Sequence, residues 1–358
     1  MPPTIQTFRA TPTVRLNGEE NERLTSLVVA MVMSEQAGGL SSLELRVTNS
    51  APLNSGSAEY AFDAGGELEL GAEIIVGAGD ASAPVEIFRG YVTGLEGLFD
   101  HDGPPELIIL AEDALQKLRF ARHTKVFENQ SMADIVRAIA NQHGLTPQIT
   151  QLDQQFGTQV QMNETDLGFL RRLLARVDAD VQVVGAELQA SPRSQVRRGE
   201  IELELGDGLR SVRVLADLAH QITQATIKGW DVANGSAVEA DGAEDALGPG
   251  QGKKGGDVVS EKFAARKQHS AQFNSFNQSE ADALATTVRN GRARRFLRAQ
   301  GVANGNPALR VGTHLRLRGV SSWFANTFYV VAAKHLFDLR EGYRTEFEAE
   351  CAFLGEAS

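Results

Sequence analysis

Short segments with alternating polarity dominate the first 112 residues of the chain. Residues 43–48, Leu-Glu-Leu-Arg-Val-Thr, place an apolar side chain at every second position. This is the period of a strand in a sheet with one buried and one solvated face. Breaks such as Gly65-Gly66 separate the apolar segments. The pattern predicts an antiparallel barrel or sandwich over residues 1–112, with strands in residues 24–33, 43–48, 68–76 and 85–95.

The apolar period becomes helical near residue 111. Ser131 and Asp134 stand in a capping-box relation, which predicts the start of a helix. The apolar side chains that follow recur on one helix face: Met132, Ile135, Val136, Ile139 and Ala140. A second helix is expected over residues 165–177, and a hairpin over residues 181–190. Together these elements predict a small α+β module over residues 113–192.

Strand-like alternation returns after residue 192 and is interrupted once. Residues 233–257 are rich in Gly, Ala, Ser and Asp, which predicts a flexible loop, and a basic helix is expected over residues 279–299. The expected second sheet domain is therefore discontinuous. It comprises residues 193–232 and 302–358, with the Gly/Ala-rich loop and the basic helix inserted as residues 233–301.

Charge is distributed unevenly along the chain. The formal net charge is -11, which argues against a nucleic-acid binder, because such proteins carry a basic face. Residues 59–113 contain thirteen acidic residues and one basic residue, a net charge of −12. Residues 253–298 contain ten basic and four acidic residues, a net charge of +6. The two regions are expected to attract each other. The sequence favours neither of the two possible contacts, within one molecule or between copies, over the other.

No segment of the sequence predicts insertion in a membrane. The longest uninterrupted apolar run, residues 27–33, has seven residues, whereas a spanning helix needs about 20. The N-terminus lacks the pattern of a secretory signal. Cys351 is the only cysteine, so no intrachain disulfide forms, and we expect a buried packing thiol in a protein made in a reducing compartment. The expected site of synthesis is the cytoplasm.

No group of residues typical of an enzyme is found. The sequence has no Walker loop, no GxSxG and no HExxH motif, and its seven histidines are dispersed. We therefore predict a protein without catalytic residues, cofactor or metal. An acidic pair such as Glu112 and Asp113 would suit a glycan hydrolase, and this enzyme class stays open.

Two binding alternatives also stay open. Residues 127–145 resemble the helical part of a LysM-type module, which would bind peptidoglycan. The arginines between Arg292 and Arg298 would suit a phosphate group, but on an acidic protein they fit a solvated helix end or a subunit contact better.

Six motifs occur in a fixed order along the chain. Residues 88–94 read Phe-Arg-Gly-Tyr-Val-Thr-Gly, and residues 161–173 contain Gln-x-Asn-Glu-Thr-Asp followed by Phe-Leu-x-Arg-Leu. The other four motifs lie in residues 113–127, 131–145, 228–231 and 342–345. In this order they resemble the late control protein D family of contractile phage tails and the hub portion of VgrG proteins of type VI secretion.

The resemblance implies a fold and a function. Members of the family form a trimeric baseplate hub, in which each subunit carries two antiparallel tube-protein-like β-barrel domains with inserted helical modules. Three such subunits present six similar units, so that a threefold spike meets a sixfold tail tube. The implied partners are two further copies of the chain, tail tube proteins, a spike protein and other baseplate proteins. The product would be a virion or contractile particle.

The resemblance also assigns structural roles and suggests which particle is involved. Because the chain stops at Ser358, we expect the spike to be a separate polypeptide, as in a phage tail, a phage-like bacteriocin or an extracellular contractile injection system. The LysM-like alternative would make the chain a peptidoglycan-binding tail protein that assists cell-wall penetration. Trp230 is expected to be a buried anchor. The motif residues with expected structural roles are Gly90, Asp113, Asn163, Glu164, Thr165, Asp166, Phe169, Leu170, Gly229, Trp230, Asp231 and Tyr343.

Overall fold

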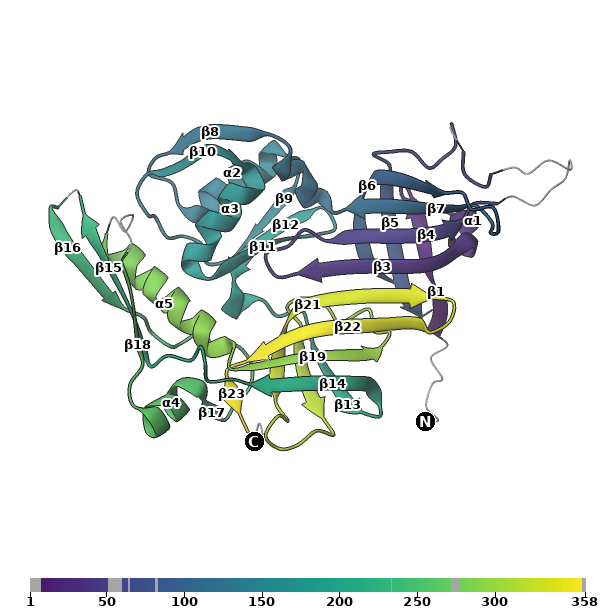
Figure 1. Cartoon of the computed structure of the whole chain (residues 1–358). Helices are drawn as coiled ribbons and strands as arrows, with labels where there is room; N and C mark the ends of the chain where they lie inside the picture. Colours follow the sequence, from purple (N-terminus) through teal and green to yellow (C-terminus); the bar gives the residue numbers. More distant parts are fainter. Residues whose placement is uncertain are drawn as a thin grey trace, which may run out of the picture.

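The computed structural model describes residues 8–50, 60–63, 65–80, 83–232, 234–271 and 277–355. Residues 1–7 of the first predicted domain, Glu59 of the acidic region and residues 272–276 of the predicted insertion lie outside the described residues. The described chain is mainly β, and its helices lie beside the sheets (Figure 1). The predicted α+β, mainly β class is confirmed.

The N-terminal part forms a curved sheet of seven strands in the order β2-β1-β5-β6-β7-β4-β3. Strand β4 buries Leu43, Leu45 and Val47, the three residues that the alternation places on one face. The apolar side chains of six of these strands, all except β2, enclose one core. The strands are β1 (Phe8–Leu16), β2 (Glu19–Glu20), β3 (Val28–Gln36), β4 (Ser42–Thr48), β5 (Glu73–Asp80), β6 (Val85–Leu98) and β7 (Glu106–Glu112).

Two strand predictions in this sheet are wrong at their N-terminal ends. The segment predicted as a strand from residue 24 begins with helix α1 (Glu22–Leu27), because the Asn21 side chain accepts a hydrogen bond from the Leu24 amide and caps a helical turn. The strand predicted from residue 68 begins only at Glu73. In both places apolar residues outside the strand still reach the core, as buried Leu24 and Leu68 show.

The second sheet is a closed barrel of six strands, in the order β21-β20-β13-β14-β19-β22, and β22 pairs again with β21. All its pairings with β19 and β21 are antiparallel, whereas β13 runs parallel to β20. Its core includes Phe328, Phe347 and Cys351. The strands are β13 (Glu200–Leu205), β14 (Gly208–Ala216), β19 (Leu297–Asn304), β20 (His314–Arg318), β21 (Thr327–Asp338) and β22 (Gly342–Cys351).

The hairpin β21–β22 belongs to both halves of the molecule. Residues 332–338 of β21 pair with β3, so the two sheets form one continuous sheet of thirteen strands. Phe337 lies in the core of the first sheet, whereas Phe347 lies in the core of the barrel. Figure 1 shows the hairpin in yellow between the two halves. The hairpin therefore fixes the position of one half relative to the other.

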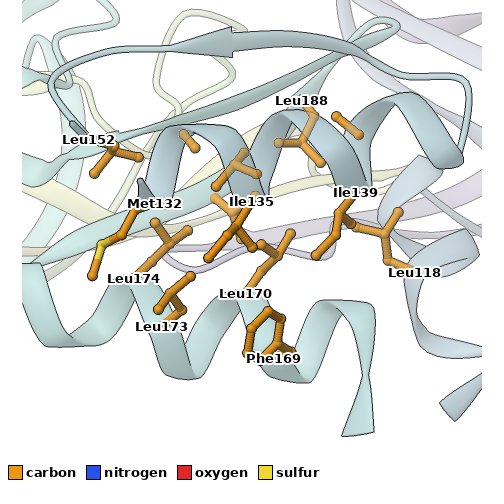
Figure 2. Packing of buried hydrophobic residues seen from close by; sticks show 14 of the residues in the cluster. Leu118, Met132, Ile135, Ile139, Leu152, Phe169, Leu170, Leu173, Leu174 and Leu188 are labelled. Carbon is orange, nitrogen blue, oxygen red and sulfur yellow. The ribbon is translucent and has the colours of Figure 1, made fainter. Parts of the chain in front are cut away.

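Residues 113–195 form a module beside the two sheets (Figure 1). Helices α2 (Met132–Gln142) and α3 (Asp166–Leu174) pack through leucine, isoleucine and phenylalanine side chains (Figure 2). The predicted capping box is present, with Ser131 and Asp134 bonded reciprocally. The remaining elements are η1 (Ala114–Arg119), β8 (Arg122–Phe127), β9 (Thr146–Ile149), β10 (Gln159–Thr165), η2 (Ala175–Val177), β11 (Ala179–Val184), β12 (Glu187–Pro192) and η3 (Arg193–Gln195).

The insertion in the second sheet domain is more ordered than the sequence predicts. Within the predicted loop, β16 (Ser236–Asp241) pairs with β15 (Gln224–Asp231), and β17 (Lys253–Lys254) and α4 (Gly255–Phe263) follow. The small residues allow close packing, since a Cβ on Gly242 would lie 2.2 Å from the Ala285 carbonyl oxygen of helix α5 (Gln278–Arg294). The insertion also contains β18 (Lys267–Ala271), and β23 (Phe353–Leu354) pairs with β17.

The basic helix is shorter than predicted. Helix α5 ends at Arg294, and strand β19 already begins at Leu297 rather than near residue 302. Leu297 and Ala299 belong to the barrel core. Pairing of this segment with β14 and β22 therefore outweighs its local helical tendency.

Leu170 provides a test of the module core. Its side chain is fully buried between α2 and α3, so Leu170→Ala is expected to lower the free energy of unfolding by about 2–5 kcal/mol through lost contacts and a cavity. Denaturant unfolding followed by circular dichroism measures the change. Met162→Ala is the control, because Met162 is 71% exposed, and its effect should stay within about 0.5 kcal/mol. Equal effects of the two substitutions would contradict the packing described.

Candidate functional site at the junction of module and sheets

The motif residues predicted from sequence lie in four separate places. Asn163, Glu164, Thr165 and Asp166 lie where β10 meets α3, and Phe169 and Leu170 follow on that helix. Gly90 of β6 and Asp113 lie where the first sheet meets the module. Gly229, Trp230 and Asp231 lie on β15, and Tyr343 lies on β22. No single pocket collects these residues, so their arrangement resembles a set of structural joints.

The Asn-Glu-Thr-Asp motif organises the start of α3. Asn163 has a positive φ of 49°, and its carbonyl oxygen accepts a hydrogen bond of 2.7 Å from Arg122 of β8. Thr165 caps the helix by accepting from the Gly168 amide at 3.1 Å. The Glu164 carboxylate forms a bidentate pair with Arg172 at 2.7 and 2.9 Å. The motif therefore joins β8, β10 and α3.

Asp166 is the buried member of this motif. Its carboxylate accepts a hydrogen bond from Gln161 Nε2 at 2.8 Å and lies 2.8 Å from His143 Nε2, just after α2. Burial alone would raise the pKa of Asp166, but the contacts from His143 and Gln161 outweigh it and hold the pKa below its usual value. Asp166 is thus a charged anchor that ties α3 to the end of α2.

Phe169 and Leu170 have the buried positions that the helix face predicts. Phe169 stacks on Phe127 of β8 with ring centroids 5.3 Å apart, and both helix residues are fully buried. The segment with LysM-like pattern, residues 127–145, contributes its apolar helix face to the same core. Peptidoglycan binding by this segment stays a prediction.

Gly90 and Asp113 lie where the first sheet meets the module. A Cβ on Gly90 would lie 2.2 Å from the Glu112 carbonyl oxygen, so only glycine fits there. The Asp113 carboxylate accepts hydrogen bonds from the Ser41 amide at 2.6 Å and the Leu115 amide at 2.9 Å. Burial raises the pKa of Asp113 despite these bonds. Asp113 therefore caps η1 and holds it against the first sheet.

Trp230 is not the buried anchor that the sequence predicts, because its side chain is 53% exposed. Helix α5 covers the face of β15 that carries Ile227, and Trp230 lies on the opposite face. Asp231 caps the following turn by accepting from the Asn234 amide at 3.0 Å. The alternation within β15 was readable from sequence, but the face covered by α5 was not.

A buried ion pair at the junction of the two sheets was missed by the sequence analysis. The Glu35 carboxylate of β3 lies 2.6 Å from Arg310 Nη2 and accepts a hydrogen bond of 2.6 Å from the Val311 amide. Burial would raise the pKa of Glu35, but Arg310, with help from Arg198, lowers it below its usual value. The sequence contained a sign of this buried charge. Glu35 continues the alternation of Met31 and Met33 and therefore lies on the buried face of β3.

Tyr343 belongs to the same junction. Its hydroxyl oxygen lies 2.7 Å from His335 Nδ1, and His335 is fully buried on β21. Burial, reinforced by the charge of Arg310, lowers the pKa of His335 to about 3. The imidazole is therefore neutral in the folded protein at ordinary pH.

Where the module meets the barrel, the structure contains a cleft of about 630 Å³. Arg294 at the end of α5 forms two bonds of 2.6 Å with Asp178, and Arg193 lies 2.9 Å from Glu350 of β22. Three further arginines line the cleft: Arg213, Arg295 and Arg298. We call this the junction cleft.

The acidic and basic regions do not pair with each other in one chain. Among the described residues, no ion pair joins residues 60–113 to residues 253–298. Arg289 and Lys254 instead share Glu244, at 3.4 and 2.8 Å. Contact between copies remains the open alternative.

The described part of the chain shows neither a metal-binding group nor a membrane-spanning helix. Its histidine, cysteine and carboxylate side chains form no group of three or more that suits a metal ion. In the same residues no helix combines the length and apolar character needed to cross a membrane.

Comparisons with known proteins give a family and a set of similar folds. The model of the family described as Alg8 N-terminal domain matches residues 9–338. No curated protein sequence matches the chain. A 43 kDa tail protein of prophage MuSo2 from Shewanella oneidensis has a similar structure, with a TM-score of 0.69 at 14% identity over 95% of this chain and 97% of that one.

Two further solved structures have the same fold. A tail protein from Neisseria meningitidis superposes with a TM-score of 0.64 at 10% identity, over 95% of this chain and 96% of that one. A component of the type VI secretion system of E. coli, described as similar to the T4 tail proteins gp27 and gp5, gives 0.58 at 13% identity, over 96% and 79%. The fold that the motif resemblance implies is confirmed.

His335 makes stability depend on pH in a way that can be measured. Its pKa is lower in the folded protein, about 3, than in an unfolded chain, about 6.5. Its contribution is therefore fully present above the unfolded pKa and is lost as the pH falls from there toward 3. Between pH 7.5 and 5.5, the wild type should lose about 1.4 kcal/mol more stability than His335→Gln. Urea unfolding at both pH values measures this difference.

The control for this experiment is His101→Gln, which replaces an exposed histidine. Its stability should change with pH as that of the wild type does. If His335→Gln loses as much stability as the wild type over the same interval, His335 is not held neutral by the fold.

Proposed function

The chain belongs to the Alg8 N-terminal domain family, and from its fold, which is similar to that of tail proteins, we propose that it is a structural hub protein in the baseplate of a contractile phage tail or phage-like contractile injection system. In this proposal three copies form a ring that adapts a sixfold tail tube to a threefold spike. The proposed partners are further copies of the chain, tail tube proteins, a spike protein and other baseplate proteins.

The observation that carries the proposal is the presence of two linked sheet units in one chain. The curved first sheet and the closed barrel are joined through β3 and β21 in a single thirteen-stranded sheet. Three chains therefore supply six sheet units, and a ring of six units offers each subunit of a sixfold tube a similar surface. The similar folds of a prophage tail protein and a type VI secretion component support the same role.

The junction between the two units suits a mechanical function. Backbone hydrogen bonds join β21 to β3, and the buried pair of Glu35 and Arg310 lies beside them. Arg171 of the module donates hydrogen bonds of 2.8 Å to the Gly38 and Gly39 carbonyl oxygens, which follow β3. Module and sheets would thus move as one body when the tail contracts. In this mechanism the motif residues hold the parts together, and none of them performs chemistry.

Oligomeric state tests the proposal. Light scattering after size-exclusion chromatography is expected to give three times the 38.6 kDa mass of one chain at micromolar concentration, either alone or with the spike protein of the same gene cluster. Electron microscopy of the intact particle should place the chain between tube and spike. A monomer under both conditions, or a position elsewhere in the particle, would rule out the hub role.

A further inference from the structure

Three arginines of the junction cleft have no partner within the described part of the chain. Arg213 lies on β14, Arg298 lies on β19, and Arg295 follows α5. All three are exposed and line the cleft of about 630 Å³. The guanidinium groups of these three residues form no hydrogen bond or ion pair among the described residues. We call these three residues the arginine rim.

The acidic residues nearest to the rim are already engaged. Glu350 lies across from Arg298 on β22, but its carboxylate is 2.9 Å from Arg193. Asp178 is held by Arg294 through two bonds of 2.6 Å. Glu348 accepts a hydrogen bond from Gln300 at 3.2 Å. The rim therefore presents guanidinium groups that are free to bind carboxylates, for which their planar forks are well suited.

Three exposed carboxylates without an ion pair among the described residues lie at the end of β6 and on the turn that leads to β7: Glu96, Asp100 and Asp102. Glu96 is on β6, and the Asp100 carboxylate accepts a hydrogen bond from the Asp102 amide at 3.2 Å. Phe99, which directly follows β6, is 70% exposed. We call residues 96–102 the acidic turn. It belongs to the region of the sequence whose net charge is −12.

The arginine rim and the acidic turn cannot meet within one molecule. The acidic turn lies at the end of the first sheet that points away from the module, whereas the rim lies beside the end of α5 (Figure 1). Two surfaces of opposite charge in separate parts of one chain are able to join one copy to the next. A contact of this head-to-tail kind closes into a ring when the rotation between copies permits it.

We propose that the junction cleft receives the acidic turn of a second copy of this chain. The inference rests on the proposed trimer and identifies the surfaces that hold it. The carboxylates of Glu96, Asp100 and Asp102 pair with the arginine rim, and Phe99 enters the cleft between them. The arginine rim is exposed to solvent until a copy docks. Added salt therefore screens its attraction to the carboxylates, and the contact weakens as the salt concentration rises.

Reversal of charge on each surface, followed by the combined reversal, tests the proposal. The rim variant carries Arg213→Glu, Arg295→Glu and Arg298→Glu, and the turn variant carries Glu96→Lys, Asp100→Lys and Asp102→Lys. Sedimentation velocity of the full chain measures the association constant. We expect each variant alone to weaken self-association at least about tenfold, because like charges then face each other. The variant with both reversals is expected to recover to within a few-fold of the wild type.

A mixing experiment tests whether the arginine rim and the acidic turn recognise each other selectively. The combined variant, labelled with a fluorophore, should associate with itself and should not enter assemblies of the wild-type chain, because both cross-contacts would place like charges together. The matched control reverses three exposed cations outside the cleft, as Lys262→Glu, Lys267→Glu and Arg340→Glu. It should associate as the wild type does. Thermal unfolding of each variant shows that it is folded before its association is measured.

The possible failures are distinguishable. A trimer that keeps its affinity in both the rim and the turn variant would overturn this contact and leave the proposed trimer intact. If the rim variant dissociates but the turn variant does not, the rim binds an acidic surface other than the acidic turn, and the inference is wrong. A wild-type chain that stays monomeric at every salt concentration, alone and with the spike, would remove the proposed function itself.

Discussion

Strand β21 pairs with β20 along its first residues and with β3 along its last ones, while β22 pairs with it along almost its whole length. This one strand therefore supplies backbone hydrogen bonds to both halves of the molecule. Its side chains do the same, since Phe328 packs in the barrel and Phe337 packs in the core of the first sheet. If the pairing of β21 with β3 were lost, the two sheets would remain, but their relative position would no longer be fixed.

Polar groups buried beside β21 favour one relative arrangement of the two sheets at their junction. Glu35 accepts bonds from Arg310 and the Val311 amide, and His335 contacts Tyr343 in the same region. Buried ion pairs contribute little net stability, but the loss of one partner leaves a buried charge without compensation. If the two sheets were displaced relative to each other, Glu35 would lose its partner and become such an uncompensated buried charge. The ion pair thus selects one arrangement of the two sheets over others with similar apolar packing.

The module is attached to this frame by arginines. Arg171 binds the carbonyl oxygens that follow β3, Arg176 pairs with Glu280 at 2.7 Å, and Arg294 pairs with Asp178. These contacts cross from the module to the first sheet and to α5, and Arg193 also pairs with Glu350 of the barrel strand β22, so both sheets hold the module. The unpaired arginines of the rim lie directly beside these paired ones. The surface proposed to bind another copy therefore lies beside the contacts that hold the module to the sheets.

Local interactions explain which features the sequence alone determined. The capping box of Ser131 and Asp134 and the apolar face of α2 involve residues a few positions apart, and the alternation in β4 reflects a single buried face. The ordered motifs indicated the fold, which the similar tail-protein structures confirm. The absence of an ordinary catalytic motif was also readable from the residues themselves.

Tertiary structure decided the features that depend on distant partners. Trp230 is exposed because α5 covers the other face of β15, and residues 236–241 form a strand because β15 pairs with them. Arg310 lies far along the chain from Glu35, and only the fold brings the two charges to 2.6 Å. The same holds for the junction cleft, which gathers residues from the module and from strands β14, β19, β21 and β22. A sequence pattern records the polarity of each residue, but the neighbour that buries or pairs it is chosen by the packing of the whole chain.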